Sequence, residues 1–526
     1  MRTALVIGSG PAAAGCILRL LDQPDLAITV IDVGARLPEA NRARAEGLRA
    51  SLPSQWLDAD WRAVTAVAKA QNGEVLPEKS VLGSTYPFDN FGQMTGVSWE
   101  GGTHVKAISG ALGGFSNVWG AQGYPFTKRA LALWPDEGKT MASAYQDVVK
   151  VIPLAGRDDE LATVLPLYGD LLELPPLAER SRRMLAASAR SREKLQRKHL
   201  VAGAARVCFH ANQCLSCGLC NSGCVWDLLF STRQLFERWI AKGQIRYYSN
   251  TLAISISERP GGQPAVEAMT VDGAPKRFVA DRIFVGAGAI GSTRIVLNSL
   301  PGIKRASLLE TRQVIIPLWS RRPVPNPQAQ PAFTVAQAAI MIAAGTPSEA
   351  FLQFYPYDPS FVGALPTLLS KSAAVRQLLV RHLSVGIVYL NSDQSPRLLV
   401  ERAPAGGGGS QSAISLSGAR LSLANRNVRR VLRSVLSASR TLDMWPLVPA
   451  AKVSPAGRSY HWGGSFPYSP EEGNDMVSDR FGRIKPWRKV HLIDAATFPT
   501  LAPTGFLLTV MANAHRIASE SLGLDI

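Results

Sequence analysis

Four cysteines crowd into one short segment near the middle of the chain, and thiolates packed this closely bind metals or inorganic clusters. They fall within 11 residues in the pattern C-x2-C-x2-C-x3-C, at Cys214, Cys217, Cys220 and Cys224. Bacterial ferredoxins use this spacing, whereas structural zinc usually takes two cysteine pairs held apart by a longer finger. We therefore expect an iron–sulfur cluster, either 4Fe-4S or 3Fe-4S. Zinc and free thiols are the alternatives.

The ligand set of this cluster is open. In ferredoxins with two clusters the fourth cysteine of such a run serves the other cluster, and a proline usually follows it. This chain has a single run, and Val225 follows its last cysteine. The fourth ligand is therefore Cys224 or, as an alternative, Cys208.

One histidine lies beside a tight glycine turn. His461 lies in the sequence Tyr-His-Trp-Gly-Gly-Ser at residues 460–465. A neutral imidazole can accept a proton from a substrate near pH 7. A lone histidine is more often structural, and we expect that of the other six.

The N-terminus has the pattern of a dinucleotide site. A strand predicted at 4–7 is followed by G-x-G-x-x-A, a helix at 14–21 and a second strand at 27–31 that ends in an acid. The glycines allow a tight turn and a close approach to a pyrophosphate at the helix N-terminus, and the acid accepts hydrogen bonds from ribose. This motif alone does not separate NAD from FAD. Its binding residues are Gly8, Gly10, Pro11, Ala12, Ala13 and Asp32.

Further glycine-rich blocks lie at 110–120 and 286–292, and each can lay backbone N–H groups against a phosphate or a flavin edge. The region 310–455 differs, because it is strand-like and carries no recognisable motif. Its apolar, basic stretch 361–385 is a membrane-surface helix, a hydrophobic lid or a core helix. The predicted strands are 313–319, 333–341, 351–357 and 383–390.

Composition excludes several classes of protein. The chain has 526 residues, of which 46% are hydrophobic and 18% charged, so it can bury large cores and is not disordered. It has no apolar run of the roughly 18 residues that a membrane span needs. The net charge of +17 is scattered and accompanies no nucleic-acid motif, so we expect no nucleic-acid partner. Glycines and a proline interrupt the N-terminal apolar run, so we expect no signal peptide and a cytoplasmic protein, with membrane association as the alternative.

Five blocks together resemble the glucose–methanol–choline (GMC) family of FAD oxidoreductases. They are the N-terminal G-x-G-x-x-A, the glycine loop at 113–117, the helix that Trp134-Pro135 opens, the block 286–292 and the C-terminal H-x-x-G-S…V-x-L-I-D-A…F-P…T-V-M-A. The match covers about half of the chain. The subset of the family with a cysteine cluster is the most similar.

The resemblance implies an α/β protein with a Rossmann-like FAD-binding domain and an interleaved α+β substrate domain, built from an antiparallel sheet plus helices. The FAD-binding domain would comprise residues 1–150, 200–309 and 456–526, with the cysteine cluster at 208–224. The substrate-binding domain would comprise residues 151–199 and 310–455.

The resemblance also implies site residues. His461 matches the histidine that serves as the family's base near flavin N5. The family usually places a second His or Asn before the last helix, where this chain has Thr504-Gly505-Phe506, so Thr504 is the nearest polar candidate. Further residues expected to bind FAD are Gly113, Gly114, Ser116, Asn117, Gly286, Ala287, Asp494, Ala495, Gly505 and Phe506.

The implied function is oxidation of an alcohol to a carbonyl by hydride transfer to FAD. We expect a sugar, glycoside or polyol as substrate and a long-chain or hydrophobic alcohol as the alternative. The cysteine cluster would pass electrons to an external acceptor such as a quinone, a cytochrome or a ferredoxin-like protein. The absent second His or Asn favours another alternative, a flavin and iron–sulfur electron carrier without alcohol chemistry.

Overall fold

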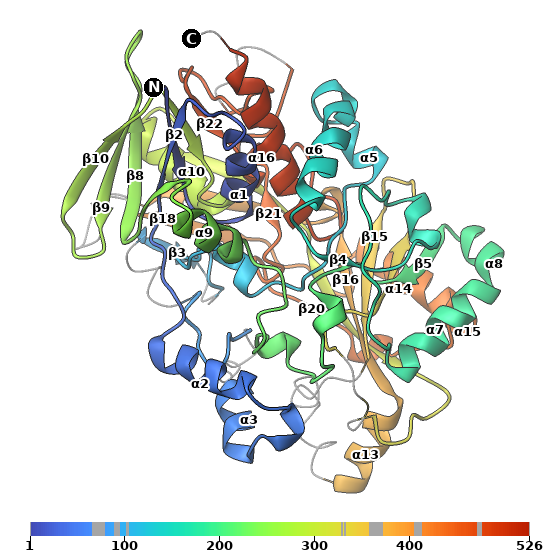
Figure 1. The fold of residues 1–526 in the computed structure, drawn as a ribbon. Coiled ribbons are helices and arrows are strands. Elements are labelled where there is room, and N and C mark those ends of the chain that lie inside the picture. The colour runs from blue at the N-terminus through green and yellow to red at the C-terminus, as the bar shows by residue number, and fades with distance from the viewer. Residues whose placement is uncertain are drawn as a thin grey trace.

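The computed structural model describes residues 2–65, 79–88, 95–100, 105–327, 330, 333–356, 372–403, 413–470 and 476–524. Two sheet-based layers lie side by side in it, with helices around them (Figure 1). One is a parallel sheet near the two chain ends, and the other is an antiparallel sheet built mainly from the middle of the chain. A cavity lined by residues of both sheets lies between them.

The parallel sheet has the strand order β22-β11-β1-β2-β7. Its members are β1 (Arg2–Ile7), β2 (Leu26–Ile31), β7 (Arg246–Tyr248), β11 (Arg282–Val285) and β22 (Val490–Leu492), and neighbouring strands run parallel. The central strands are apolar on both faces, as expected for a parallel sheet covered by helices. Strands from the first and last parts of the chain therefore share one sheet.

Helix α1 (Pro11–Leu20) connects β1 to β2 and packs closely on the C-terminal helix α16 (Leu507–Leu522). A Cβ atom at Gly15 would lie 2.1 Å from the carbonyl oxygen of Met511, so only glycine permits this approach. Both helices begin at the same cavity, because residues at their first turns line it. The contact therefore fixes the two N-termini relative to each other.

The antiparallel sheet has the order β19-β13-β16-β15-β14-β5, with β20 also paired to β13. Its long strands are β13 (Gln313–Trp319), β16 (Leu383–Leu390), β15 (Ala350–Tyr355) and β14 (Ala338–Ile342), and short β19 (Trp445–Pro446) and β20 (Lys452–Val453) lie at one side. One face packs against α7 (Glu179–Arg190) and α14 (Arg426–Ser437) in a second hydrophobic core. The other face contributes side chains to the cavity.

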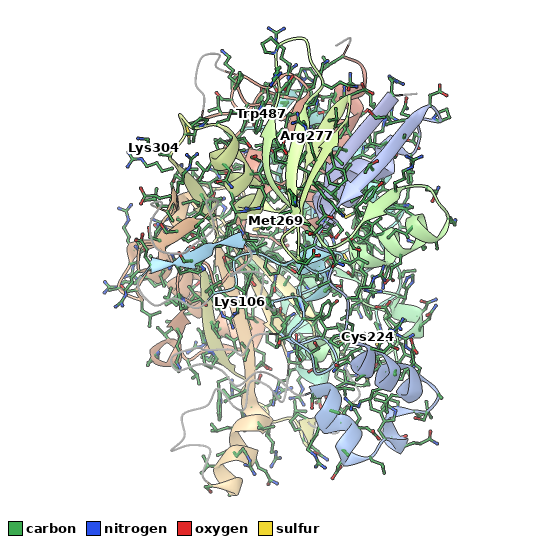
Figure 2. The ribbon with its side chains drawn as sticks, turned by 90° about the vertical axis from the view of Figure 1, so that its left-hand side faces the viewer. Lys106, Cys224, Met269, Arg277, Lys304 and Trp487 are labelled. Atoms are coloured by element: carbon green, nitrogen blue, oxygen red, sulfur yellow. The ribbon has the colours of Figure 1, made fainter. Side chains whose placement is uncertain are left out.

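Two smaller sheets complete the frame. A meander of β8 (Thr251–Ser257), β9 (Ala265–Thr270) and β10 (Pro275–Val279) extends beside the parallel sheet, where Met269 and Arg277 mark it in Figure 2. The other sheet has the order β21-β12-β17-β18-β3, with bounds β21 (Trp462–Gly463), β12 (Arg305–Glu310), β17 (Leu398–Arg402), β18 (Ile414–Gly418) and β3 (Val97–Trp99). It anchors the segment that carries His461.

The predicted fold class is confirmed: a Rossmann-like parallel sheet with helices alternates along the chain with an antiparallel sheet backed by helices. The domain boundaries stay predictions. One strand bears on them, since β5 (Leu200–Ala204) begins where the expected FAD-binding segment resumes but pairs with β14 of the antiparallel sheet. β5 belongs structurally with the region expected to bind substrate.

Several predicted elements differ in detail. The strand expected at 333–341 begins only at Ala338, and the helix expected from Trp134-Pro135 is a short 3-10 turn (Pro135–Gly138) followed by α6 (Lys139–Val149). Residues 361–371 of the stretch 361–385, and the glycine run 406–410, lie outside the described residues; the rest of that stretch forms α13 (Ala373–His382) and the start of β16. No described helix is long and apolar enough to cross a membrane.

Candidate cofactor and catalytic site

One cavity of about 400 Å³ lies between the two large sheets, within the usual range for a small-molecule or cofactor site. Its wall on the parallel-sheet side is the N-terminal glycine loop, the end of β2 and the turn after β11. Its other wall comes from β13, β15 and β16 and from the segment around His461. The expected site residues that line it are Gly8, Gly10, Pro11, Ala12, Asp32, Gly114, Ser116, Gly286, Ala287, His461, Asp494, Ala495, Gly505 and Phe506.

The N-terminal loop has the backbone that a dinucleotide requires. Gly8 has a φ of +97°, and a Cβ there would lie 2.6 Å from the carbonyl oxygen of Gly286, so the two glycine turns touch. Gly10 is different, because a Cβ there would meet no atom within 4 Å. Its backbone is open toward the cavity, as close approach of a pyrophosphate demands. Ala13, in the first turn of α1, is fully buried in the main hydrophobic core and does not line the cavity.

Asp32 lies at the end of β2 and lines the cavity. Its carboxylate accepts hydrogen bonds from the hydroxyl of Ser9 and from that of Tyr247 at 3.0 Å. Burial raises the pKa of Asp32 to about 6, and the two hydroxyl donors oppose this. The carboxylate is therefore ionised at neutral pH but close to its titration range.

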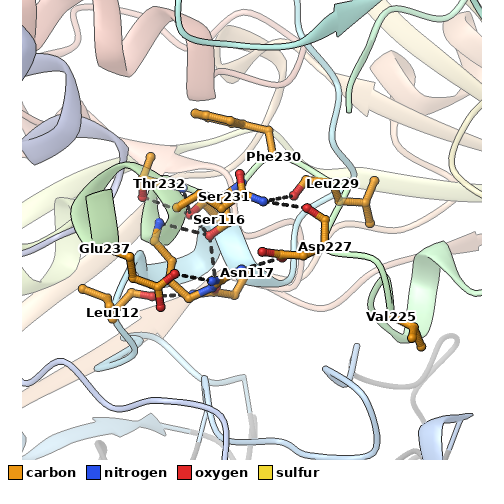
Figure 3. Close-up of polar contacts among 12 residues, drawn as sticks. Leu112, Ser116, Asn117, Val225, Asp227, Leu229, Phe230, Ser231, Thr232 and Glu237 are labelled. Atoms are coloured by element: carbon orange, nitrogen blue, oxygen red, sulfur yellow. Dashed lines mark hydrogen bonds and ion pairs between the residues drawn. The ribbon is translucent and has the colours of Figure 1, made fainter. Parts of the chain in front are cut away.

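The glycine-rich loop after residue 110 is held in shape by its polar side chains. Asn117 donates to the carbonyl oxygens of Leu112 and Gly114 at 2.9 and 2.8 Å, and it accepts from Ser231. Ser116 accepts from the backbone N–H of Thr232 at 3.0 Å. Figure 3 shows how these contacts bind the loop to the start of α9 (Thr232–Ala241).

Two of the residues expected to bind FAD in this loop, Asn117 and Gly113, lie beside the cavity-lining residues but do not line the cavity themselves. Gly113 has a φ of +89°, and a Cβ there would lie 2.7 Å from the backbone nitrogen of Arg233, so glycine is needed for the loop to contact α9. Gly113 also donates its N–H to Ser9 Oγ at 2.9 Å, which links this loop to the N-terminal one.

The third glycine turn meets the end of β22. Asp494 caps a short 3-10 turn (Ala495–Thr497) by accepting from the N–H of Ala496 at 2.9 Å, and it accepts from the hydroxyl of Ser292. Burial raises the pKa of Asp494 to about 6, against the effect of these donors. Gly288, at the N-terminus of α10 (Ala289–Ser299), has a φ of +77° and open space at its Cβ position.

His461 lines the opposite end of the cavity in a setting suited to a neutral base. Its Nδ1 is 3.1 Å from the hydroxyl oxygen of Thr311, and its ring lies 4.8 Å from that of Tyr389 and 4.9 Å from that of Phe506. Burial lowers the pKa of His461 to about 4. The imidazole is therefore uncharged and able to accept a proton across the physiological range.

A buried ion pair holds the segment that carries this histidine. Glu310 and Arg312 are fully buried, and Arg312 Nη2 lies 2.9 Å from Glu310 Oε2. Glu310 also accepts from the N–H of Gly457 at 2.7 Å and from the hydroxyl of Ser459, and Ser459 in turn accepts from the N–H of His461 at 3.2 Å. The end of β12 thus fixes both the backbone and the ring of His461.

Thr504 does not have the place that the sequence led us to expect. Its side chain is fully buried, its hydroxyl has no hydrogen-bond partner among the described residues, and it does not line the cavity. The neighbouring Gly505 and Phe506 do line it. Among the described lining residues, His461 is the only histidine, and none is an asparagine.

Sequence reasoning missed the polar residues on the antiparallel-sheet side. Gln122, Gln313, Gln353, Tyr355 and Tyr389 line the cavity, and Gln122 Oε1 has no partner among the described residues. Gln313 donates to the hydroxyl of Tyr389 at 3.1 Å, and Tyr355 donates to Gln353 at 2.8 Å. No motif marks these positions. Alternation along the predicted strands could have assigned Gln313, Gln353, Tyr355 and Tyr389 to one face, but Gln122 lies on none of those strands.

The four cysteines 214–224 lie between β6 (Val207–Cys208) and α9, and Cys220 begins a short 3-10 turn (Cys220–Ser222). Figure 2 shows Cys224 beside the N-terminal helices α2 (Glu39–Arg49) and α3 (Asp58–Thr65). Two sulfurs accept backbone N–H groups at 3.4 Å, Cys214 from Ser216 and Cys220 from Thr334. Burial raises the pKa of Cys217 to about 11 and that of Cys220 to about 12, and the neighbouring thiols add to both shifts.

The described residues, the four thiols included, contain no group of three or more His, Cys, Asp or Glu side chains arranged to hold a metal ion. The alternative ligand Cys208 is fully buried on β6, where burial raises its pKa, and it packs in the main hydrophobic core. We therefore derive no chemical step through a cluster.

The residues on the parallel-sheet side do fit an FAD molecule. This cofactor needs an open glycine backbone at a helix N-terminus and a carboxylate at the end of the second strand, and both are present. It also needs a cavity that continues to a base, and this cavity reaches the buried His461.

Comparison with known proteins gives a match in structure alone. No family model matches the chain, and its sequence matches no curated protein. Among solved structures, the crystal structure of pyridoxine 4-oxidase from Mesorbium loti matches with a TM-score of 0.59 and 15% sequence identity, covering 100% of both chains. Over its whole length, the chain thus shares its fold with pyridoxine 4-oxidase.

Proposed function

We propose that this chain is an FAD-dependent oxidoreductase that oxidises an alcohol to a carbonyl. The observation that carries the proposal is a single cavity that has a dinucleotide-binding loop at one end and a buried, neutral histidine at the other. The fold shared with an oxidase agrees with it. FAD, when bound, would supply the acceptor for the hydride that leaves the alcohol carbon.

The chain's own residues have separable roles in this proposal. The backbone of Gly10 and the start of α1 would hold the pyrophosphate, and Asp32 would bind the ribose. His461 would take the hydroxyl proton of the alcohol. Thr311 would keep the ring in place, and the aromatic rings of Tyr389 and Phe506 would exclude water from it.

For the substrate, we propose a neutral sugar, glycoside or polyol. Amide and phenol groups on β13, β15 and β16 can exchange hydrogen bonds with several hydroxyl groups, and Tyr389 and Phe506 offer flat surfaces beside His461. A long-chain alcohol would leave the unpaired Gln122 Oε1 without a donor. The buried amide therefore favours the polyhydroxylated substrate.

The electron acceptor is the least constrained part of the proposal. An iron–sulfur relay rests on the cysteine spacing alone, and the N–H groups that reach Cys214 and Cys220 are compatible with it. Iron and acid-labile sulfide should be measured on chain purified without oxygen. Three or four irons per chain, lost in Cys217→Ser, would support the relay, and zinc or no metal would exclude it.

The test of the main proposal is anaerobic flavin reduction. The purified chain should contain FAD, and its flavin absorbance should bleach on addition of at least one alcohol from a panel of sugars, polyols and long-chain alcohols. Bleaching only by long-chain alcohols would contradict the proposed substrate. Chain that takes up no FAD would contradict the cofactor and the function.

A second candidate function is electron transfer without alcohol chemistry. The buried position of Thr504 favours it, because the loop before α16 presents no second proton-transfer group to the cavity. In that case no alcohol would bleach the flavin, whereas an external reductant would.

A further inference from the structure

A buried arginine with unused hydrogen-bond donors lies at the cavity wall. Arg294 belongs to α10 and is 1% exposed. Its Nη2 donates to the carbonyl oxygen of Ala253 at 2.5 Å, but its Nε and Nη1 have no partner among the described residues. A buried guanidinium left in this state is costly, because it loses water without gaining acceptors.

The surroundings of Arg294 offer no compensating charge. Burial lowers its pKa to about 10, and no carboxylate opposes that shift. Another buried arginine, Arg312, has its partner in Glu310, whereas Arg206 also keeps unpartnered donors but does not line the cavity. Arg294 thus differs from a structural ion pair, and its free donors call for a ligand with acceptor atoms.

Arg294 lies at the end of the cavity where Asp32 is found. Thr251, Leu252 and Ala253 line the cavity together with Arg294, and Thr251 donates its backbone N–H to the carbonyl oxygen of Asp32 at 2.9 Å. Ala253, which accepts from Arg294, is two residues further along β8.

We propose that Arg294 binds the adenosine half of the dinucleotide, where ring nitrogens and ribose oxygens supply the missing acceptors. The inference rests on the proposed function in one respect, namely that a dinucleotide fills the cavity. It adds a residue outside the glycine motif and the acid. It also predicts selectivity, because a flavin mononucleotide has no adenosine to offer.

The competing explanation is that Arg294 only ties α10 to β8. Asn298, one turn further along α10, provides a matched control for this. Its Nδ2 donates to the carbonyl oxygen of Ile254, the residue after Ala253, at 3.2 Å, but Asn298 does not line the cavity. Asn298→Ala therefore weakens the same helix–strand contact and leaves the cavity unchanged.

The experiment titrates the full-length chain and its variants with FAD, with ADP and with FMN by calorimetry. Losing hydrogen bonds from a charged donor should weaken binding of FAD and of ADP about 10- to 100-fold in Arg294→Met, with FMN unaffected. Arg294→Lys keeps the charge and should fall between, and Asn298→Ala should bind all three like the wild type. Without ligand, Arg294→Met should melt at the wild-type temperature or above it.

Several outcomes would overturn the inference. They are wild-type affinity of Arg294→Met for ADP, an equal loss for FMN, or the same loss in Asn298→Ala. If Arg294→Met does not fold, wild-type ADP affinity in Arg294→Lys together with a lowered melting temperature would also assign the residue to packing. Failure of the wild type to bind FAD would count instead against the proposed function.

Discussion

The two walls of the cavity are built by different means. On the parallel-sheet side, the wall is mainly backbone, because glycines at positions 8, 10 and 288 expose main-chain groups to the cavity. Asp32 is one of the few side chains there that can bind a cofactor. On the antiparallel-sheet side, amides, phenols and an imidazole face inward from pleated strands. One wall is therefore constrained by sterics and the other by side-chain chemistry.

The difference explains what each wall can tolerate. A wall made of backbone is distorted when any Cβ is added at a crowded glycine, whatever the chemistry of the new residue. A wall of side chains can exchange one polar group for another and change its preferred ligand while the sheet stays intact. We expect substitutions on the first wall to affect folding and cofactor retention, and those on the second to affect rates and substrate choice.

The largest effect should come from a pair of glycine substitutions. Gly8→Val forces a side chain onto a residue with a φ of +97° and against the oxygen of Gly286, so we expect little folded protein and no bound FAD. Gly10→Ala meets no atom of the chain, so it should fold normally and lose FAD because its methyl enters the cavity. Circular dichroism and the FAD-to-protein ratio measure both. A soluble, flavin-loaded Gly8→Val would break the comparison.

On the opposite wall, His461→Ala should lower the rate of flavin reduction by about 100-fold or more while FAD stays bound. The reason is the loss of the only histidine among the described lining residues. Anaerobic stopped-flow measurement of flavin bleaching gives the rate. His210→Ala, at an exposed histidine away from the cavity, is the control and should reduce its flavin normally. Near-normal reduction by His461→Ala would move the base elsewhere.

A smaller effect is expected at Thr311, which contacts His461 and not the cavity. Thr311→Val keeps the shape but removes the hydroxyl, so the ring is less well oriented and flavin reduction should slow about 10-fold with KM unchanged. Thr311→Ser should restore the rate. A rise in KM, or no rescue by serine, would show a packing role instead of a positioning one.

The smallest effect is a difference in pH dependence between FAD binding at one wall and flavin reduction at the other. The pKa of Asp32 is about 6, so its carboxylate is protonated as the pH falls from 7.5 to 5, and FAD affinity should fall several-fold over that range. Asp32→Asn should bind FAD more weakly and show a flat pH dependence. The pKa of His461 is about 4, so a saturated enzyme should keep its flavin-reduction rate down to about that pH. An acid limb near pH 6.5 would indicate an exposed base.

The sequence was informative where backbone geometry limits the choice of residue. The strand, glycine turn and acid at residues 4–32 are found as predicted, because few sequences satisfy that turn. The catalytic role of His461 stays a prediction from the family resemblance, and the structure places this residue at the cavity. The contacts of Asn117 and Gly113 with the start of α9 could not be predicted, since they join residues more than a hundred positions apart.

The substrate-side wall could not be predicted for a related reason. Gln313, Gln353 and Tyr389 are ordinary strand residues whose importance appears only when three strands align in register. The cysteine segment is the reverse case. Its spacing is conspicuous in the sequence, yet the described residues contain no assembled metal centre.

The pairing of β22 with β11 and the packing of α16 on α1 have a consequence for how the protein is made. A ribosome must have released nearly the entire polypeptide before the first glycine turn meets the helix that completes its pocket. Prosthetic-group insertion should then be a late event in biogenesis, and nascent chains stalled before residue 490 should emerge without colour.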